Sequence, residues 1–359
     1  MKFSCPEEIN FDTGSCERTF ESQLDYACDR INGIKNPYIG NKRKILNYII
    51  REIKKEGIKF DSVLDIFSGS ASFSMVMKIL GKEVISNDIL YSSFLYAKCF
   101  VENNSYVLND EDRKYLIHNK NNADGFISQK FINRFTQDEA EELNNFKQNA
   151  LSIFESDKDD IGYCMAMISI QLFIMDRCFL GGRLNRGQVL ADLDHRLNHK
   201  RNRGESMNLH KMIWPDFNEN DFVISEKSKA YNLDVIEFLD KIKPQADLVY
   251  IDPPYGGSQS DYHDMYNFFE EFACPKNRQI DSKKFVNKSD YKNNFVDLLD
   301  RLSYLPCWVI SYNDSSWESI DVIKKIVKDF KKTVKVTDIG YKYKYRKNPI
   351  GKEFLIISY

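Results

Sequence analysis

Several features that define whole classes of protein are missing from this sequence of 359 residues. Its eight cysteines include no Cys-x-x-Cys pair and its five histidines form no cluster at metal-ligand spacing, which predicts free thiols in a reducing cytosol and no metal site. The amino-terminal residues lack a signal-peptide pattern. The longest apolar run, near residues 161–175, contains Gln171 and ends at Asp176, so it is too short to span a bilayer. We therefore expect a cytoplasmic protein that does not enter a membrane.

A strong charge of either sign is also missing. Lys and Arg total 51 against 53 Asp and Glu, giving a net charge of −2, which by itself does not indicate nucleic-acid binding. Residues 183–211 and 324–352 are nevertheless locally basic, and each run is either a binding surface or a solvated face. With 42% hydrophobic and 29% charged residues, the composition is that of a globular protein. The length favours a large α/β domain that carries a smaller insert.

The most informative stretch is an apolar run that ends in an acid and two prolines. The run at residues 248–251 is short and consists of apolar residues, two of them β-branched and one aromatic, as in a strand covered on both faces. Pro253 and Pro254 cannot continue a ladder, so the chain leaves the sheet at Asp252. Ligands of open α/β sheets bind at the carboxyl ends of the strands. We expect Asp252 and Tyr255 at the mouth of a site.

Such a loop suits methylation of an exocyclic amine. The lone pair of an aromatic amine is conjugated into its ring, so two acceptors, the Asp252 carboxylate and the Pro253 carbonyl, would draw the nitrogen towards tetrahedral geometry. Tyr255 would stack on the ring. The alternative is a stiff turn with Tyr255 as packing.

A nucleoside site is indicated nearer the amino terminus. Residues 62–73 run from a strand through a turn of small residues into a helix, which allows close approach to a ligand. The next strand, residues 83–86, ends at Asn87 and Asp88, and an acid there is placed to hold ribose hydroxyls. A dinucleotide site is the rival, but Gly-x-Gly-x-x-Gly is absent. The pattern favours a nucleoside cofactor without a pyrophosphate.

Upstream of this unit, Tyr38 and Lys42 lie in a loop that leads into a helix with apolar residues at helical spacing from residue 45 to 53. A helix amino terminus binds anions, so this pair would hold the carboxylate end of a cofactor. A surface loop with a basic tip is the alternative.

The pattern changes between residues 101 and 230, where we expect helices at 138–156 and 161–179 followed by a polar, basic stretch. Arg, Asn, Gln and His are the side chains that read base edges and phosphates, which favours an inserted recognition module over a plain polar loop. Its candidate DNA-binding residues are Arg183, Arg186, Arg196, Lys200, Arg201 and Arg203. We divide the chain into an extension (1–35), a catalytic domain (36–100 and 231–359) and this insert (101–230).

The carboxyl-terminal part predicts further elements of the sheet. We expect a helix at 235–242, a strand at 307–314, and a basic hairpin formed by 342–346 and 354–359 that closes the sheet. The aromatic residues at 262, 266, 268 and 269 would cover a bound base or fill the core. Cys307 follows a proline but opens an apolar strand, so we interpret it as a core residue.

Taken in order, five motifs resemble the Dam-like, alpha-group adenine-N6 DNA methyltransferases; they lie at residues 38–42, 65–71, 87–88, 252–255 and 310–314. The resemblance implies a Rossmann-like, S-adenosylmethionine-dependent methyltransferase sheet with an inserted, mainly helical target-recognition domain. It assigns catalysis to Asp252, Pro253, Pro254 and Tyr255. It assigns S-adenosylmethionine contacts to Tyr38, Lys42, Asp65, Phe67, Gly69, Asp88, Asp234 and Asp252, with Asp65 bracing the turn. Ala71 departs from the family, which often has glycine there.

The activity implied is direct methyl transfer to N6 of a flipped adenine in double-stranded DNA, by an orphan enzyme or one paired with a restriction endonuclease, and the default is a monomer. Cytosine-N4 methyltransferases often carry Ser where this chain has Asp252. Cytosine-C5 chemistry needs a Pro-Cys nucleophile, and Cys307 lacks its partner motifs. RNA methylation, glutamine methylation through an Asn-Pro-Pro-Tyr variant of the loop, and an inactive DNA-binding protein stay open as alternatives.

Overall fold

Successive side chains of the central strands point to opposite faces of a sheet. Within β4 (Leu248–Ile251), Leu248 and Tyr250 join one hydrophobic core, whereas Val249 and Ile251 join another. All four are buried, as the apolar run in the sequence predicts for a strand with both faces covered.

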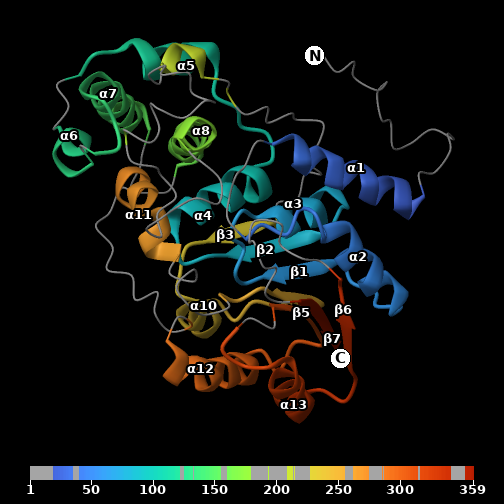
Figure 1. Cartoon of the computed structure of the whole chain (residues 1–359). Helices are drawn as coiled ribbons and strands as arrows, with labels where there is room; N and C mark the ends of the chain where they lie inside the picture. Colours follow the sequence, from blue (N-terminus) through green and yellow to red (C-terminus); the bar gives the residue numbers. More distant parts are fainter. Residues whose placement is uncertain are drawn as a thin grey trace, which may run out of the picture.

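The computed structural model describes residues 19–34, 40–121, 125–131, 133–154, 160–178, 193, 208–212, 214, 227–254, 262–274, 285, 287–313, 316–340 and 352–359. Its strands form a seven-stranded sheet in the order β3-β2-β1-β4-β5-β7-β6 (Figure 1). Strands β1 to β5 run parallel, and β7 is antiparallel to both β5 and β6. The remaining bounds are β1 (Ser62–Asp65), β2 (Glu83–Asn87), β3 (Lys229–Tyr231), β5 (Cys307–Asn313), β6 (Val334–Asp338) and β7 (Glu353–Ser358). This arrangement confirms the predicted α/β class with a Rossmann-like sheet.

Helices cover both faces of the sheet (Figure 1). One face packs against α1 (Phe20–Gly33), α2 (Leu46–Lys55), α3 (Ser72–Ile79) and α4 (Tyr91–Ala97). The other packs against α10 (Val235–Ile242), α12 (Lys288–Arg301) and α13 (Ile320–Phe330). Since β1, β2, β3 and β4 end at the same edge, the polar residues that follow them are brought together there.

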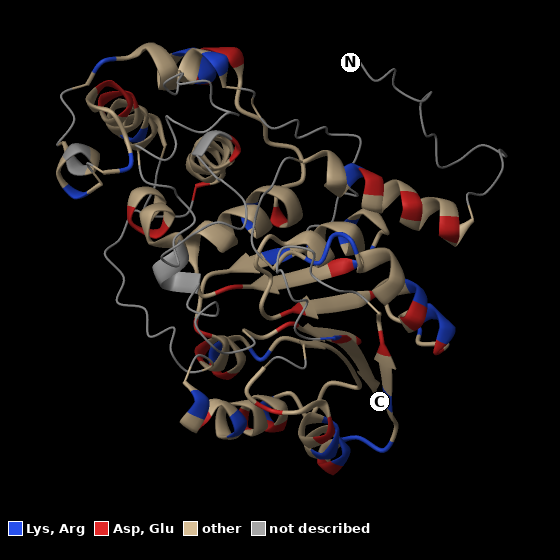
Figure 2. Cartoon of the chain, viewed as in Figure 1, with Lys and Arg blue, Asp and Glu red and all other residues tan. Residues whose placement is uncertain are grey.

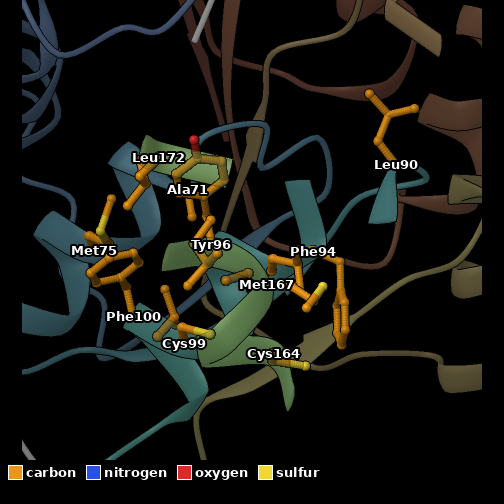
Figure 3. Close-up of a cluster of buried hydrophobic side chains, with 14 of the residues drawn as sticks. Ala71, Met75, Leu90, Phe94, Tyr96, Cys99, Phe100, Cys164, Met167 and Leu172 are labelled. Atoms are coloured by element: carbon orange, nitrogen blue, oxygen red, sulfur yellow. The ribbon is translucent and has the colours of Figure 1, made fainter. Parts of the chain in front are cut away.

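The helices of residues 101–230 extend the first of these two cores. They are α5 (Asp110–His118), α6 (Phe126–Lys130), α7 (Gln137–Ile153) and α8 (Ile161–Cys178), and they follow the π-helix η1 (Lys98–Glu102) and precede the short 3-10 helix η3 (Leu209–Lys211). Figure 3 shows side chains of α3, α4, η1 and α8 in one cluster, among them Met75, Tyr96, Phe100 and Met167. The described part of this segment therefore shares its core with the sheet. Among the described helices, none is long and apolar enough to cross a membrane.

Most expected elements are found close to their expected bounds. The helix expected at 138–156 ends at Ile153, because Phe154 takes an extended conformation at its carboxyl-terminal cap. An antiparallel pair closes the sheet, and the strand beside β7 is β6, residues 334–338. Residues 342–346, expected as the first strand of this hairpin, lie outside the described part of the chain. Val334 and Val336 give β6 the β-branched character of a strand.

The aromatic residues of the helix that follows the β4 loop belong to the core. Tyr266, Phe268 and Phe269, on α11 (Tyr262–Ala273), are buried in the first cluster, so they do not cover a base; the side chain of Tyr262 lies outside the described part. Cys307 is buried, as predicted. Among the described residues, the cysteines at 28, 99, 164, 274 and 307 form no disulfide.

Charged residues gather on the outer helices. Figure 2 shows Lys, Arg, Asp and Glu together on α1, α2 and α13, while the strands carry few. On α13 the exposed lysines Lys325 and Lys328 lie between the exposed acids Asp321 and Asp329, and such a mixture of charges is typical of a solvated face.

The carboxylate of Glu270 fastens α11 to α4. Its two oxygens accept hydrogen bonds from the backbone N–H groups of Tyr91 and Ser92, each at 2.8 Å, at the first turn of α4. Glu270 is 5% exposed. A carboxylate in this place satisfies amide groups that the helix itself leaves without partners.

We expect Glu270→Gln to lower the free energy of unfolding by about 1–3 kcal/mol, because one buried N–H loses its acceptor and the charge at the helix terminus is lost. Chemical denaturation measures the change. The control is Glu271→Gln at the neighbouring position, where the partly exposed carboxylate pairs with Lys130 and the change should stay within about 0.5 kcal/mol. Equal losses in both variants would contradict the proposed anchoring role.

Candidate active site

A buried lysine forms ion pairs with two carboxylates at the edge of the sheet where the parallel strands end. The ammonium Nζ of Lys42 lies 3.2 Å from Oδ1 of Asp252 and 2.9 Å from Oε1 of Glu353. The side chains of Lys42, Asp252 and Glu353 are 5%, 17% and 0% exposed. Lys42 precedes α2, Asp252 follows β4 and Glu353 opens β7, so three distant segments of the chain meet here.

Glu353 has further hydrogen-bond donors besides Lys42. Ser311 Oγ donates to its Oε1 at 2.7 Å and Asn313 Nδ2 to its Oε2 at 3.1 Å. Asn313 is paired directly with Glu353 between β5 and β7. Burial raises the pKa of Glu353, but the Lys42 charge and these hydrogen bonds together outweigh it, so its pKa is lower than usual. The carboxylate is therefore ionised.

The loop after β4 begins as the sequence predicts. Ile251 is the last residue of the strand, Pro253 is buried, and Asp252 and Pro254 are partly exposed. The chain thus leaves the sheet at the expected acid. Tyr255 and Tyr38, both predicted site residues, lie outside the described residues, as do Arg183, Arg186, Arg196, Lys200, Arg201 and Arg203.

Asp88 supports the turn that follows β1. Its Oδ2 accepts the N–H of Gly69 at 2.8 Å and its Oδ1 the N–H of Leu90 at 2.9 Å. Gly69 has a φ of 51°, a left-handed conformation that glycine adopts without strain. Burial, chiefly, raises the pKa of Asp88 to about 6, although both backbone hydrogen bonds oppose this. Asp88 thus braces the turn, and Asp65, the residue expected in that role, bonds across the same turn to Ser74 on α3.

The backbone conformation of Ala71 is one that glycine adopts more easily than alanine. Ala71 has a φ of 52° and immediately precedes α3, so its side chain sits in a left-handed conformation that costs on the order of 1 kcal/mol. Its methyl group is fully buried in the first core, which offsets part of this cost.

Asp65 is the buried acid at the end of β1. Its Oδ2 accepts from Ser74 Oγ at 2.6 Å, whereas its Oδ1 has no hydrogen-bond partner among the described residues. Ser68 Oγ, in the same turn, is likewise buried without a partner among them. Burial raises the pKa of Asp65 to about 7, and the charges of Asp252 and Asp88 add to the increase. This acceptor, close to two other acids, fits a ligand group that donates hydrogen bonds and carries positive charge.

The other two predicted cofactor residues have structural contacts. Asp234 caps α10, where its Oδ1 accepts the N–H groups of Ile236 and Glu237 at 3.0 and 3.3 Å. Phe67 packs edge-on against Phe285 at 5.5 Å between ring centroids. Both lie at the same edge of the sheet as Asp65, and their contact with a cofactor stays a prediction.

The sequence interpretation assigned no contacts to Glu353, Asn87 or Asn232. Asn87 bonds to the backbone of Leu233, and Asn232 donates to the carbonyls of Asp88 and Ile89, so these amides join the ends of β2 and β3. The sequence does contain a signal for Glu353. This acid begins an apolar strand, and it lies on the same face of the strand as Leu355 and Ile357, which predicts that it points into the core. For the asparagines only the strand-end position pointed to a role.

Comparison with known proteins gives consistent results. The family of D12 class N6 adenine-specific DNA methyltransferases matches residues 38–339. The chain is 27% identical over 314 residues to the type II methyltransferase M2.HphI of Haemophilus parahaemolyticus, covering 86% of this chain and 91% of that protein. It is 26% identical to the type II methyltransferase M.FokI of Planomicrobium okeanokoites and to the modification methylase StsI of Streptococcus sanguinis. These matches cover 86% and 88% of this chain, which spans about half the length of those two proteins, 49% and 50%.

The raised pKa of Asp65 makes stability depend on pH. Because its pKa rises from 3.8 to about 7 on folding, its contribution to stability is fully present below pH 3.8 and is lost as the pH rises through 7. Asparagine cannot ionise and still accepts from Ser74. We expect Asp65→Asn to raise the free energy of unfolding at pH 8 by an amount on the order of a few kcal/mol. The gain should shrink towards pH 5.

Thermal unfolding of the ligand-free protein between pH 5 and 8.5 measures this difference. Asp61→Asn is the control, since that carboxylate is 97% exposed and should change little at any pH. A gain from Asp65→Asn that is the same at pH 5 and pH 8 would show that Asp65 does not carry the raised pKa.

Proposed function

Because the chain belongs to the family of D12 class N6 adenine-specific DNA methyltransferases, we propose that it methylates N6 of an adenine flipped out of duplex DNA, with S-adenosylmethionine as the donor. The observation that carries this proposal is Asp252, held by Lys42 at the carboxyl end of β4 beside the turn of β1. The order of the motifs supports placing the chain in the Dam-like alpha group.

Asp252 and the loop after it would activate the amine. The carboxylate of Asp252 and the carbonyl of Pro253 accept the two N–H bonds of N6, so the nitrogen lone pair is freed from the ring and faces the methyl group. Asp252 is also the group placed to take the proton that N6 loses. Tyr255 stacks on the flipped base, which offsets part of the few kcal/mol that unstacking costs. When bound, S-adenosylmethionine supplies a methyl group on a positively charged sulfur.

The cofactor would lie over the turn between β1 and α3. Oδ1 of Asp65, which has no hydrogen-bond partner among the described residues, suits the ammonium group of the methionine part. Asp88 suits the ribose hydroxyls because each of its oxygens can accept a second hydrogen bond. Gly69 allows close approach of the backbone. The paired carboxylates around Lys42 support a role for this lysine in orienting Asp252.

The segment 101–230 is our candidate for target recognition. It supplies the basic stretch from residue 183 to 203, and phosphate contacts from such a stretch would position the duplex. The relatives named as type II methyltransferases or modification methylases support a role in restriction and modification, with a cognate endonuclease that acts on the same site. A monomer is sufficient for this reaction.

Replacement of Asp252 tests the catalytic assignment. Asp252→Asn keeps the shape of the side chain but presents a weaker acceptor and no base, so we expect transfer of a labelled methyl group to unmethylated duplex DNA to fall on the order of a thousand-fold. Melting temperature should show that the variant is folded. Asp297→Asn on the outer face of α12, where the carboxylate pairs with Arg301, should retain the wild-type rate. A folded Asp252→Asn variant with wild-type activity would exclude the assignment.

Replacement of the basic insert residues tests the recognition assignment. We expect Gln at Arg196 or Arg201 to weaken DNA binding and to reduce the salt dependence of binding by about one ion for each lost phosphate contact. S-adenosylmethionine binding should be unaffected. Lys54→Gln on α2, a position 51% exposed, serves as the control. An unchanged salt slope for all six candidate residues would remove this stretch from the DNA interface.

A further inference from the structure

Glu353 lies in a site built to hold an ionised carboxylate away from water. Its side chain is 0% exposed, and its oxygens accept hydrogen bonds from Lys42, Ser311 and Asn313 in place of water. A buried carboxylate is costly unless it is paired and hydrogen-bonded, and here both conditions are met by three separate residues. Because no part of Glu353 is exposed, it cannot itself touch DNA or a cofactor.

Lys42 lies between Glu353 and Asp252 and contacts both carboxylates. Its ammonium is 2.9 Å from Glu353 and 3.2 Å from Asp252, so one positive charge serves two carboxylates. In a buried site such charges interact much more strongly than in water. Without the charge of Glu353, the ammonium would act more strongly on Asp252 and would make it a weaker acceptor for an amino group.

We propose that Glu353 is a positioning residue for methyl transfer that acts through Lys42. It fixes the ammonium beside Asp252 and takes up part of its charge, so that the Asp252 carboxylate keeps both its orientation and its strength as an acceptor. Ser311 and Asn313 hold Glu353 in place. This inference rests on the proposed function, because the group that it serves is the acceptor for N6.

The hydrogen bonds to Glu353 also give a role to the motif at residues 310–314, to which the assignments of cofactor and base contacts give none. Ser311 and Asn313 lie on β5, where they belong to the predicted polar strand end at 310–314, and Glu353 is their neighbour on β7. The antiparallel β7 inserted next to β5 is what brings this acid to within reach of Lys42. The edge of the sheet thus takes part in the site.

Single-turnover methyl transfer to duplex DNA tests the proposal. We expect Glu353→Gln, which preserves shape but not charge, to slow transfer on the order of ten- to a hundred-fold, with equilibrium binding of S-adenosylmethionine unchanged. The control is Asp338→Asn on β6, which likewise turns a lysine-paired carboxylate into an amide but lies at the surface, 38% exposed. That variant should transfer at the wild-type rate.

A double-mutant cycle with Lys42 separates positioning from a merely structural role. If Glu353 acts through Lys42, then Glu353→Gln should cause no further loss in a Lys42→Met background. Losses that multiply independently would overturn the proposal, and so would a folded Glu353→Gln enzyme with wild-type transfer.

Ser311→Ala provides a second variant in case Glu353→Gln does not fold. It removes one neutral donor from Glu353 and leaves every charge in place, so we expect a several-fold slower transfer that disappears in the Lys42→Met background; wild-type transfer by folded Ser311→Ala would then overturn the proposal. The wild-type enzyme decides the underlying function separately. If it forms no N6-methyladenine, the proposed function fails, whereas a methylating wild type with an equally fast Glu353→Gln variant contradicts only the role of Glu353.

Discussion

The site depends on one ammonium group shared between two carboxylates. Lys42 pairs with Asp252, which is partly exposed at the proposed substrate site, and with the fully buried Glu353. Each contact comes from a different part of the sheet, β4 and β7, so the sheet must be assembled before the loop acid is oriented. Burial of this group is acceptable because every charge has a partner of opposite sign within hydrogen-bond reach.

A second set of acids surrounds the expected cofactor position. Asp65 and Asp88 follow β1 and β2 and have raised pKa values, about 7 and about 6, mainly because they are buried. Asp88 already supports the turn at Gly69, while Asp65 has an oxygen without a partner among the described residues. Two costly carboxylates beside a small-residue turn are expected where a positively charged ligand binds, since the ligand offsets the cost when it arrives.

The sequence predicted the local features well, because they depend on neighbouring residues. The apolar run 248–251 and the two prolines after it determine both the strand and the point where the chain leaves the sheet. Asp234, as the amino-terminal cap, accounts for the agreement between the expected helix 235–242 and α10. The strand beside β7 is residues 334–338, whose β-branched side chains favour a strand, and the expected segment 342–346 lies outside the described residues.

The alternation of the last strand marks Glu353 as a buried acid, but its partners Lys42 and Ser311 could not be predicted, because they are distant along the chain and the pairing of β7 with β5 is a tertiary feature. The same applies to the packing of α8 into the core beside the sheet, which a helical pattern alone does not predict. Sequence patterns predicted the methyltransferase family to which the chain belongs. The structure adds the ion pairs of Lys42 that hold Asp252 in place.

The most direct test of the account identifies the methylated nucleoside. Unmethylated duplex DNA is treated with the protein and labelled S-adenosylmethionine, digested, and analysed by mass spectrometry. The account predicts label in N6-methyldeoxyadenosine alone. Label in N4-methyldeoxycytidine, or cofactor binding without any label in DNA, would contradict it.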